Sequence, residues 1–390
     1  MFYIFIFDFF QLQGYIQIKN KDFCMNSENN TTTLATNDSM NHPIFSGNIY
    51  IFSSFDVGFD IDFKNLKQSK EIKTEYAHIS KFFKHYHLPL EIEIPELQEE
   101  SRYISSKIHQ FGAISLTYKI PFSETLPDLR STLLKIDEKY QRQSTNDAYN
   151  IFKKIKSFIV RPNFYHMKSM YTVIQLNINK NMTGSEIKNI YGLDIASLLR
   201  FETESLSDYQ KEIILASAVG YFKKDLIVID TQAAFIYDQQ YKELLDFFEF
   251  GNIQQLELHY FDKLLDRQLA TLYERKVQNL PVLSYMPFIG SRYFDPIGDL
   301  NKLKVDISVI TERLEGSIKF SGEAYFSEIY NLIIKQMDLR SWQKSIDKKI
   351  NILKEIRYVY QNKVDANRED LISILIITLI MIEVFLALVK

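Results

Sequence analysis

LISILIITLIMIEVFLALV, residues 371–389, is the stretch that decides the architecture of this chain. At 1.5 Å per residue an α-helix of this length reaches about 28 Å, close to the ~30 Å hydrocarbon core of a bilayer. Glu383 is its one charged residue. A helix that is apolar on every face has no polar side to turn toward water. The segment therefore predicts a single C-terminal transmembrane helix rather than a core helix of a soluble domain.

The residues that flank this helix predict its orientation. Four basic residues precede it within twenty positions, whereas Lys390 alone follows it: Lys354, Arg357, Lys363 and Arg368. The excess of Lys and Arg on one side indicates a cytoplasmic N-terminal part. Residues 2–10 are apolar but too short for a signal peptide, and they lack a basic start and a small-residue cleavage site. We expect residues 1–43 to be an extension or disordered, with Met1, Met25 or Met40 as the start.

Composition excludes several classes of protein. Lys and Arg total 46 and Asp and Glu total 49, so the net charge is −3 and gives no strong nucleic-acid signal. Cys24 is the only cysteine, which leaves no internal disulfide and no thiolate zinc site. The motifs GxxxxGK[ST], GxGxxG, GxSxG and HExxH are absent from the sequence. We therefore expect a protein without catalytic activity, cofactor or bound metal.

Residues 44–238 carry the pattern of an α+β domain. Strands are expected at 47–63, 88–94, 111–122 and 171–178, and in the LIVI and AAFIY runs between Asp225 and Asp238. Helices are expected at 64–86, from Pro127 with Leu129, Leu133, Leu134 and Ile136 on the apolar side, at 148–158, and within 185–223. Ser207 and Gln210 form a plausible capping pair. Strands and helices mix here without a repeating βαβ period.

Residues 239–370 predict a helical arm between this domain and the anchor at 371–389. A long helix over 240–276 carries the stripe Leu258, Phe261, Leu265, Leu269 and Leu272, and a loop is expected over 277–298. Two further stripes, at 300–314 and at 346–364, favour two long antiparallel helices or a coiled coil. The second of these helices is expected to run from about Leu339 into the membrane segment without interruption.

Several polar residues are candidates for chemistry. His85 and His87, with His78 upstream, are two apart and could ligate a metal, or could be surface histidines. Asp225, Asp230 and Asp238 bracket the two short strands and are either site carboxylates or solvated turn residues. Asp262 and Asp266 are a like-charge i,i+4 pair, for which Lys263 and Arg267 are the expected partners. Glu383 is costly in a bilayer and is interpreted as an assembly contact or as a headgroup-level residue.

Residues 347–388, DKKINILKEIRYVYQNKVDANREDLISILIITLIMIEVFLAL, resemble the closing segment of the YagE family, also called "required for meiotic nuclear division". The matching positions are Leu353 and the run 379–384, which contains Glu383. Residues 247–273 resemble a segment of uncharacterised bacterial membrane proteins, which more often carry Ala-Asn-Val and a basic residue where this chain has Gly251–Asn252–Ile253 and His259. The resemblance implies a cytoplasmic or matrix-facing α+β part, a helical arm, one anchor, large assemblies, and support of translation at the mitochondrial inner membrane. It transfers no catalytic residue.

The sequence thus favours a non-catalytic, single-pass membrane protein that assembles or tethers. The expected partners are the lipid bilayer, further copies of the chain and an unidentified protein. The residues expected to carry membrane contact and assembly are Glu383, Leu353, Ile346, Ile350 and Ile356. The alternatives are a membrane-attached ligand-binding or enzymatic domain with a carboxylate-lined site, and a tether for the translation apparatus. A pocket lined by converging carboxylates or histidines would favour the ligand-binding alternative.

Overall fold

The structure is a computed structural model that describes residues 43–70, 72–77, 79, 88–93, 103–165, 167–179, 181–274, 305, 307 and 324–389. Its described elements form an N-terminal mixed α/β domain followed by helices, the last of which is apolar. The predicted fold class is therefore confirmed. The histidines at 78, 85 and 87, the loop at 277–298, and all of 300–314 except Val305 and Ile307 lie outside the described residues, as does Cys24.

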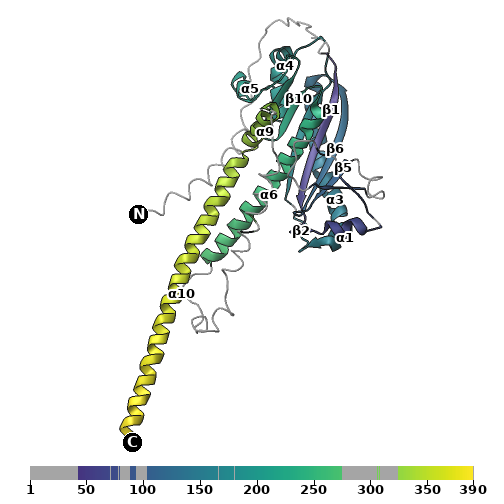
Figure 1. Ribbon diagram of the computed structural model, residues 1–390. Helices are drawn as coiled ribbons and strands as arrows, with labels where there is room; N and C mark the ends of the chain where they lie inside the picture. The colour runs from purple at the N-terminus through teal and green to yellow at the C-terminus, as the bar shows by residue number, and fades with distance from the viewer. Residues whose placement is uncertain are drawn as a thin grey trace, which may run out of the picture. The chain divides into compact units, whose positions relative to one another are not determined.

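An eight-stranded sheet is the centre of the domain (Figure 1). Its spatial order is β3-β4-β5-β6-β1-β8-β10-β9. All neighbouring pairs are antiparallel except β8 and β10, which run parallel. The strands are β1 Phe45–Asp56, β3 Lys73–Tyr76, β4 Leu90–Glu93, β5 Tyr103–His109, β6 Ala113–Glu124, β8 Lys168–Leu176, β9 Leu226–Ile229 and β10 Ala233–Tyr237. A separate two-stranded sheet pairs β2 Asp60–Ile61 with β7 Ile159–Val160.

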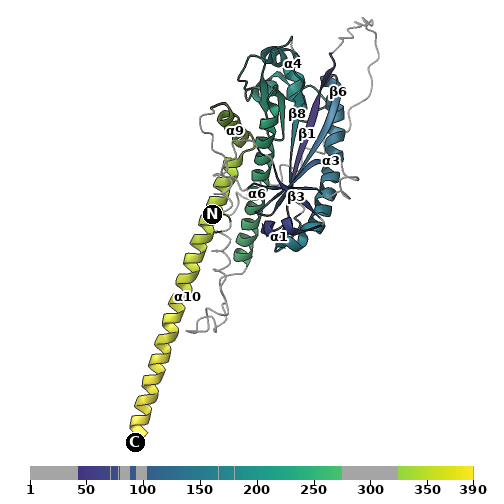
Figure 2. The same ribbon diagram turned by 45° about the vertical axis from the view of Figure 1, so that its right-hand side comes forward.

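Helices cover both faces of this sheet. They are α1 Phe63–Gln68, α3 Leu126–Ile155, η1 Lys156–Phe158, α4 Gly184–Leu199, α5 Asp208–Leu215, α6 Tyr241–Glu274, α9 Ala324–Gln336 and α10 Leu339–Val389. Figure 2 shows the sheet between α3 on one side and α6 on the other. The α4 and α5 helices lie on the α3 side, and α9 lies on the α6 side.

The alternation of β1 explains why both faces need a cover. Ile49 and Ile51 belong to the core under α3, whereas Tyr50 and Phe52 belong to the core under α6. Successive side chains of a strand point to opposite faces, so a strand that is apolar at every position must be buried on both. The sheet is therefore the middle of three layers.

Side-chain caps fix where the helices start. Thr125 accepts a hydrogen bond from the backbone N–H of Asp128, ahead of Pro127 in the first turn of α3. Thr183 and Glu186 form a reciprocal capping box at α4. The Ser207 hydroxyl accepts from the backbone N–H of Gln210, which confirms the cap predicted at α5.

Three local predictions were wrong. The stretch 64–86, expected to be helical, holds β3 in addition to the short α1, because Lys73–Tyr76 pairs with β4 along the sheet edge. The strand β5 was missed, since serines and lysine interrupt its apolar alternation. The two helices expected after Pro127 are one continuous α3, because the polar segment 141–147 is compatible with a helix: Thr145 bonds back to Gln141 within the helix, and Asp147 accepts from the Tyr118 hydroxyl of β6.

Helices α6 and α10 run parallel, side by side. His259 contacts Trp342, Asp262 accepts from Ser345, and Asp266 pairs with Lys349, so both helices advance together along the chain. Gly251 of α6 allows the close approach of α9, since a Cβ there would meet Ile333 at 2.8 Å and Met337 at 3.0 Å. Helix α6, the start of the predicted arm, thus packs on the sheet with one end and on α10 with the other.

The last helix contains one span long and apolar enough to cross a membrane, Asp365–Val389. None of that window is buried against the rest of the protein. Helix α10 continues from Leu339 to Val389 without a break, as the sequence predicted, and reaches about 75 Å. The structure therefore contains one candidate membrane-spanning helix, joined rigidly to the part that packs on α6.

Candidate functional site

A crevice opens where the two parallel strands end. Because β8 and β10 run in the same direction, their carboxyl ends meet at one edge of the sheet. Ligands of open α/β sheets bind outside the carboxyl ends of such strands. A cavity of about 1190 Å³ lies here, lined by the end of β8, the loop before β9, the residues between β10 and α6, and the first residues of α9.

Two of the aspartates singled out from the sequence converge on this cavity. Asp225 precedes β9 and Asp238 follows β10, and the antiparallel pairing of Leu226 with Tyr237 places them at the same end of the hairpin. Asp230 lies at the opposite end, where its carboxylate pairs with Arg200 at 2.7 Å. The structure therefore brings together two of the three predicted carboxylates and separates the third.

Backbone donors hold both carboxylates in place. Asp225 accepts from the N–H of Phe222 at 2.9 Å, and Asp238 accepts from the N–H of Gln240 at 2.7 Å. Burial raises the pKa of Asp225 against the opposing effect of its backbone hydrogen bond, and the charge of Asp238 raises this pKa further. The two acids are thus close enough to repel each other, and Asp238 is only 6% exposed.

Aromatic rings supply much of the remaining wall. Tyr221 contacts Tyr325 with ring centroids 5.0 Å apart, and the Tyr325 hydroxyl donates to Asp238 at 3.4 Å. Tyr241, at the start of α6, accepts a 3.4 Å hydrogen bond from the hydroxyl of Tyr50 of β1. Burial raises the pKa of Tyr325, and the negative charge of Asp238 adds to that rise. The Tyr325 phenol therefore stays neutral at physiological pH and acts as a hydrogen-bond donor within the aromatic wall.

The groups that line this crevice are suited to binding a small molecule. The described residues contain no group of three or more His, Cys, Asp or Glu side chains that could hold a metal ion. Paired acids, amides and tyrosines are instead the polar groups that orient a small molecule within an aromatic pocket. The amide of Gln175, which accepts from Asn48 at 2.7 Å, supplies a further fixed polar group at the end of β8.

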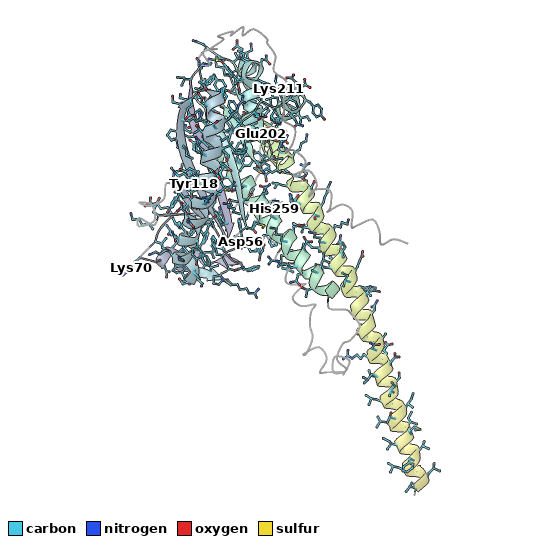
Figure 3. All side chains as sticks on the ribbon, turned by 180° about the vertical axis from the view of Figure 1, so that it is seen from behind. Asp56, Lys70, Tyr118, Glu202, Lys211 and His259 are labelled. Atoms are coloured by element: carbon cyan, nitrogen blue, oxygen red, sulfur yellow. The ribbon has the colours of Figure 1, made fainter. Side chains whose placement is uncertain are left out.

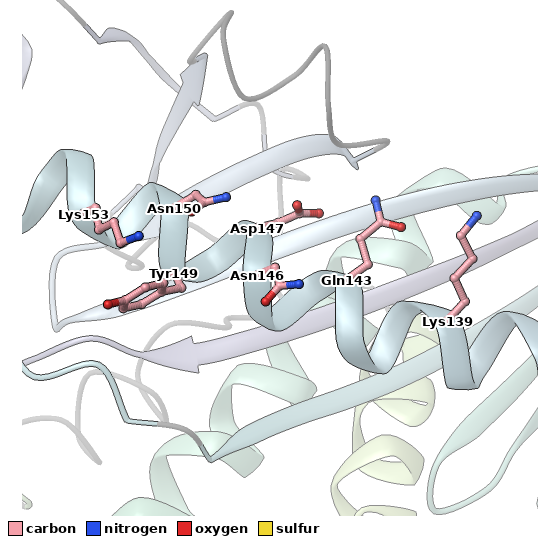
Figure 4. Close-up of a pocket in the computed structure, with 7 residues that line it drawn as sticks. All are labelled: Lys139, Gln143, Asn146, Asp147, Tyr149, Asn150 and Lys153. Atoms are coloured by element: carbon pink, nitrogen blue, oxygen red, sulfur yellow. The ribbon is translucent and has the colours of Figure 1, made fainter.

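A second hollow, of about 660 Å³, lies on the outer face of α3 (Figure 4). All of its described lining residues come from that one helix, from Lys139 to Lys153. Lys153 lies over the ring of Tyr149, 4.3 Å from its centroid, and so covers part of the surface. A hollow with a single described wall offers fewer convergent groups than the crevice.

A buried polar layer under α6 was not foreseen from the sequence. Glu249 accepts from Lys107 at 2.6 Å and from Ser115 at 2.7 Å. Burial acts to raise the pKa of Glu249, but the charge of Lys107 and the hydrogen bonds from Lys107 and Ser115 together outweigh it, so the pKa is lowered and Glu249 is ionised. The Asn252 amide donates to Ser54 and to backbone carbonyls of β1 and β8. The polar residues Glu249 and Asn252 within the mostly apolar run 247–253 were the signal that could have revealed this layer.

The same layer holds an acid pair. Asp56 at the end of β1 and Glu257 of α6 are 4% and 2% exposed. Burial raises the pKa of Asp56 to about 7, against a hydrogen bond from the backbone of Gly58. Burial also raises the pKa of Glu257, and the charge of Asp56 adds to this. Figure 3 shows Asp56 on the sheet side of α6 and His259 on the side toward α10.

The residues predicted to carry assembly lie in two different settings. Ile346 and Leu353 are buried against α6 within the same chain, and Ile350 is partly buried there. Ile356 is half-buried, and Glu383 lies within the candidate membrane span. The stripe at 346–353 therefore has an intramolecular partner.

The partner predicted for the acidic pair of α6 was wrong. Lys349 of α10 contacts Asp262 at 2.6 Å and Asp266 at 2.7 Å, bridging the two helices. Arg267, one of the expected partners, donates instead to the Tyr165 hydroxyl. Spacing within one helix could not indicate this, since the cation comes from a helix more than eighty residues later.

Residues 46–243 match the family described as "Uncharacterized protein MJ0711, N-terminal domain". The curated relative is the uncharacterized protein MJ0711 of Methanocaldococcus jannaschii, 23% identical over 198 residues, which are 50% of this chain and 59% of that protein. No solved structure matches the chain. Residues 347–388, which resemble the YagE family, and residues 247–273, which resemble bacterial membrane proteins, lie beyond the matched range, so both resemblances stay predictions.

Proposed function

The chain belongs to the family of the uncharacterized protein MJ0711, and from that premise we propose that it is a membrane-anchored protein whose α/β domain binds a small molecule. The binding site is the crevice at the carboxyl ends of β8 and β10. The observation that carries this proposal is the convergence of Asp225 and Asp238 on one cavity of about 1190 Å³. Converging carboxylates were the feature that favours ligand binding over tethering by a flat surface.

The extent of the family match supports the choice of site. The matched residues 46–243 include both parallel strands, both aspartates and the start of α6. They exclude α9 and α10, and so they exclude the candidate span. Most residues that line the crevice therefore lie in the shared domain, whereas Tyr325 and the candidate span lie outside the matched range.

The helices supply a mechanism for anchoring. Helix α6 begins at the crevice with Tyr241 and pairs farther on with α10, which continues into the apolar span. The domain is thus held beside the bilayer by packed helices rather than by a loose linker. The basic residues that precede the span support a cytoplasmic location for this domain. Protease added to sealed cells should leave the domain uncut. Cleavage of the domain would show that it lies on the outer side of the membrane.

A variant that fills the crevice tests the proposal. Gln239 is exposed and lines the cavity, so Gln239→Trp should occupy space there without disturbing the core. Gln232→Trp, in the exposed turn at the other end of the same hairpin, is the matched control. A small-molecule library screened by thermal shift on the detergent-solubilised chain should give hits that Gln239→Trp loses and Gln232→Trp keeps. Hits that both variants keep would place binding elsewhere.

Assembly through α10 is a second candidate function. Tyr358 and Val359 are 69% and 64% exposed shortly before the span, where no other described element covers them. Glu383 within the span could hydrogen-bond to a second copy, a contact worth only ~0.6–2 kcal/mol in membranes. Cross-linking in native membranes should then show oligomers that Glu383→Gln retains and Glu383→Leu weakens about tenfold. Equal cross-linking of the Leu variant and the wild type would remove Glu383 from the interface.

A further inference from the structure

We propose that the ligand of the crevice is an organic cation, a small primary amine on an aromatic or apolar frame. This inference rests on the proposed function above and names the chemistry of the same site. It follows from three features of the cavity: its fixed negative charge, its aromatic walls and the position of its lysines.

Among the residues that the structure describes, neither carboxylate of the crevice forms an ion pair. Asp238 is 6% exposed, and its oxygens accept from the Gln240 N–H and the Tyr325 hydroxyl, both neutral donors. Asp225 accepts from the N–H of Phe222. Over the residues that the structure describes, no Lys, Arg or His lies within ion-pairing distance of either carboxylate. A cation bound between them would relieve their repulsion.

The aromatic rings are placed to contact such a cation. Tyr221 and Phe222 are 63% and 65% exposed, although both carry large apolar rings. They pack edge to face with centroids 4.8 Å apart, and Tyr221 also contacts Tyr325, whose hydroxyl reaches Asp238. Ring faces attract ammonium groups, and this attraction adds to that of a carboxylate. The combination of acid and aromatic wall is the chemistry of amine recognition.

Lys223 and Lys224 also line the cavity and could be thought to favour an anion. Both are exposed, so their ammonium groups can remain in water at the end of flexible stems. The carboxylate of Asp238 is buried and cannot withdraw from a ligand. An anion that entered would therefore meet two fixed carboxylates. A metal cation fits poorly as well, since no group of three or more His, Cys, Asp or Glu ligands forms anywhere in the described parts of the chain.

Three probes of one shape separate these charges. Phenethylamine, phenethyl alcohol and 3-phenylpropionate present an ammonium, a hydroxyl and a carboxylate on the same ring and linker. Isothermal titration calorimetry with the full chain in detergent micelles should show binding of the amine, at least about tenfold weaker binding of the alcohol, and none of the acid at millimolar concentration.

Matched variants locate the binding. Asp238→Asn should weaken phenethylamine binding about tenfold, and Tyr221→Leu about threefold. Asp208→Asn and Tyr209→Leu change the same residue types at exposed positions on α5, outside the cavity, and should bind as the wild type does.

Tighter or equal binding of the alcohol or the acid would overturn the amine proposal, and so would the failure of all three probes. A different result would refute the proposed function: no compound of the library binds the wild type and fails to bind Gln239→Trp. A weakened Asp238→Asn variant that still melts at the wild-type temperature would show that its effect is on the ligand and not on folding.

Discussion

Replacing Lys349 by Met tests the contact that fixes α10 on α6. The Lys349 ammonium lies 2.6 Å from Asp262 and 2.7 Å from Asp266, and burial lowers its pKa less than the two hydrogen-bonded carboxylates raise it. Methionine keeps the length and apolar character of the lysine stem but removes the charge. The two carboxylates, one turn apart on α6, would then repel each other with no cation between them.

The exposed fractions of the three side chains determine how much free energy of unfolding the variant should lose. Removing one member of a fully buried ion pair costs ~3–5 kcal/mol, whereas exposed pairs are worth ~0.2–1 kcal/mol. The side chains of Lys349 and Asp262 are 18% and 11% exposed, but that of Asp266 is 57% exposed. The cost should lie between these limits, at about 2 kcal/mol, with Asp262 responsible for most of it.

The single tryptophan of the chain reports on this contact directly. Trp342 packs edge-on against His259 in the α6–α10 seam, with centroids 4.1 Å apart, so its fluorescence changes when the seam opens. Urea unfolding in mild detergent should show a lower midpoint for Lys349→Met than for Lys348→Met, a change at the exposed neighbour. Adding Asp262→Asn should restore part of the loss. If the free energies of unfolding of Lys349→Met and Lys348→Met agree within about 0.5 kcal/mol, the ion pair of Lys349 does not stabilise the contact between α6 and α10.

Asp56→Asn should flatten the dependence of stability on pH. Burial raises the folded pKa of Asp56 to about 7 from 3.8, so the folded state binds the extra proton and wild-type stability falls as pH rises from about 4 to 7. Urea midpoints across that range should fall less in the variant, and equal slopes would contradict the assignment. Asn252→Ala should lower the free energy of unfolding by ~1–3 kcal/mol, because it removes buried hydrogen bonds to Ser54 and to backbone carbonyls, whereas the exposed Asn362→Ala should lower it by almost nothing in the same urea titrations. Deletion of residues 371–390 should release the chain from carbonate-washed membranes, and a truncated chain that still pellets would refute a single anchor.

Local sequence patterns were sufficient for most of the fold. The runs at 171–178 and 226–237 contain strands because β-branched and aromatic residues predominate in them, as is typical of strands buried on both faces. The stripe Leu258, Phe261 and Leu265 is buried as its spacing predicts. β3 and β5 were harder to predict: β3 is an edge strand exposed to solvent, and the serines and the lysine of β5 interrupt its apolar alternation. The parallel pairing of α6 with α10 depends on contacts distant in sequence, which periodicity does not encode.

The candidate site was predictable only in part for the same reason. Asp225, Asp230 and Asp238 stand out in the sequence as acids at strand ends, but the hairpin register decides which two meet. Tyr221 and Tyr325 come from segments a hundred residues apart, and no motif links them. The residues chosen for assembly, Ile346 and Leu353, form a stripe that any packed helix would show, and its partner is α6 of the same chain.

The polar layer under α6 gives this helix a fixed position along the sheet. An entirely apolar face can slide by a turn at little cost, because dispersion contacts are not directional. Glu249 has its donors on β5 and β6, whereas Asn252 has its acceptors on β1 and β8, so only one register satisfies both. That register sets where Tyr241 enters the crevice at one end and where Asp262 meets Lys349 at the other. The crevice and the membrane helix are therefore positioned by the same buried hydrogen bonds, although neither contacts the other.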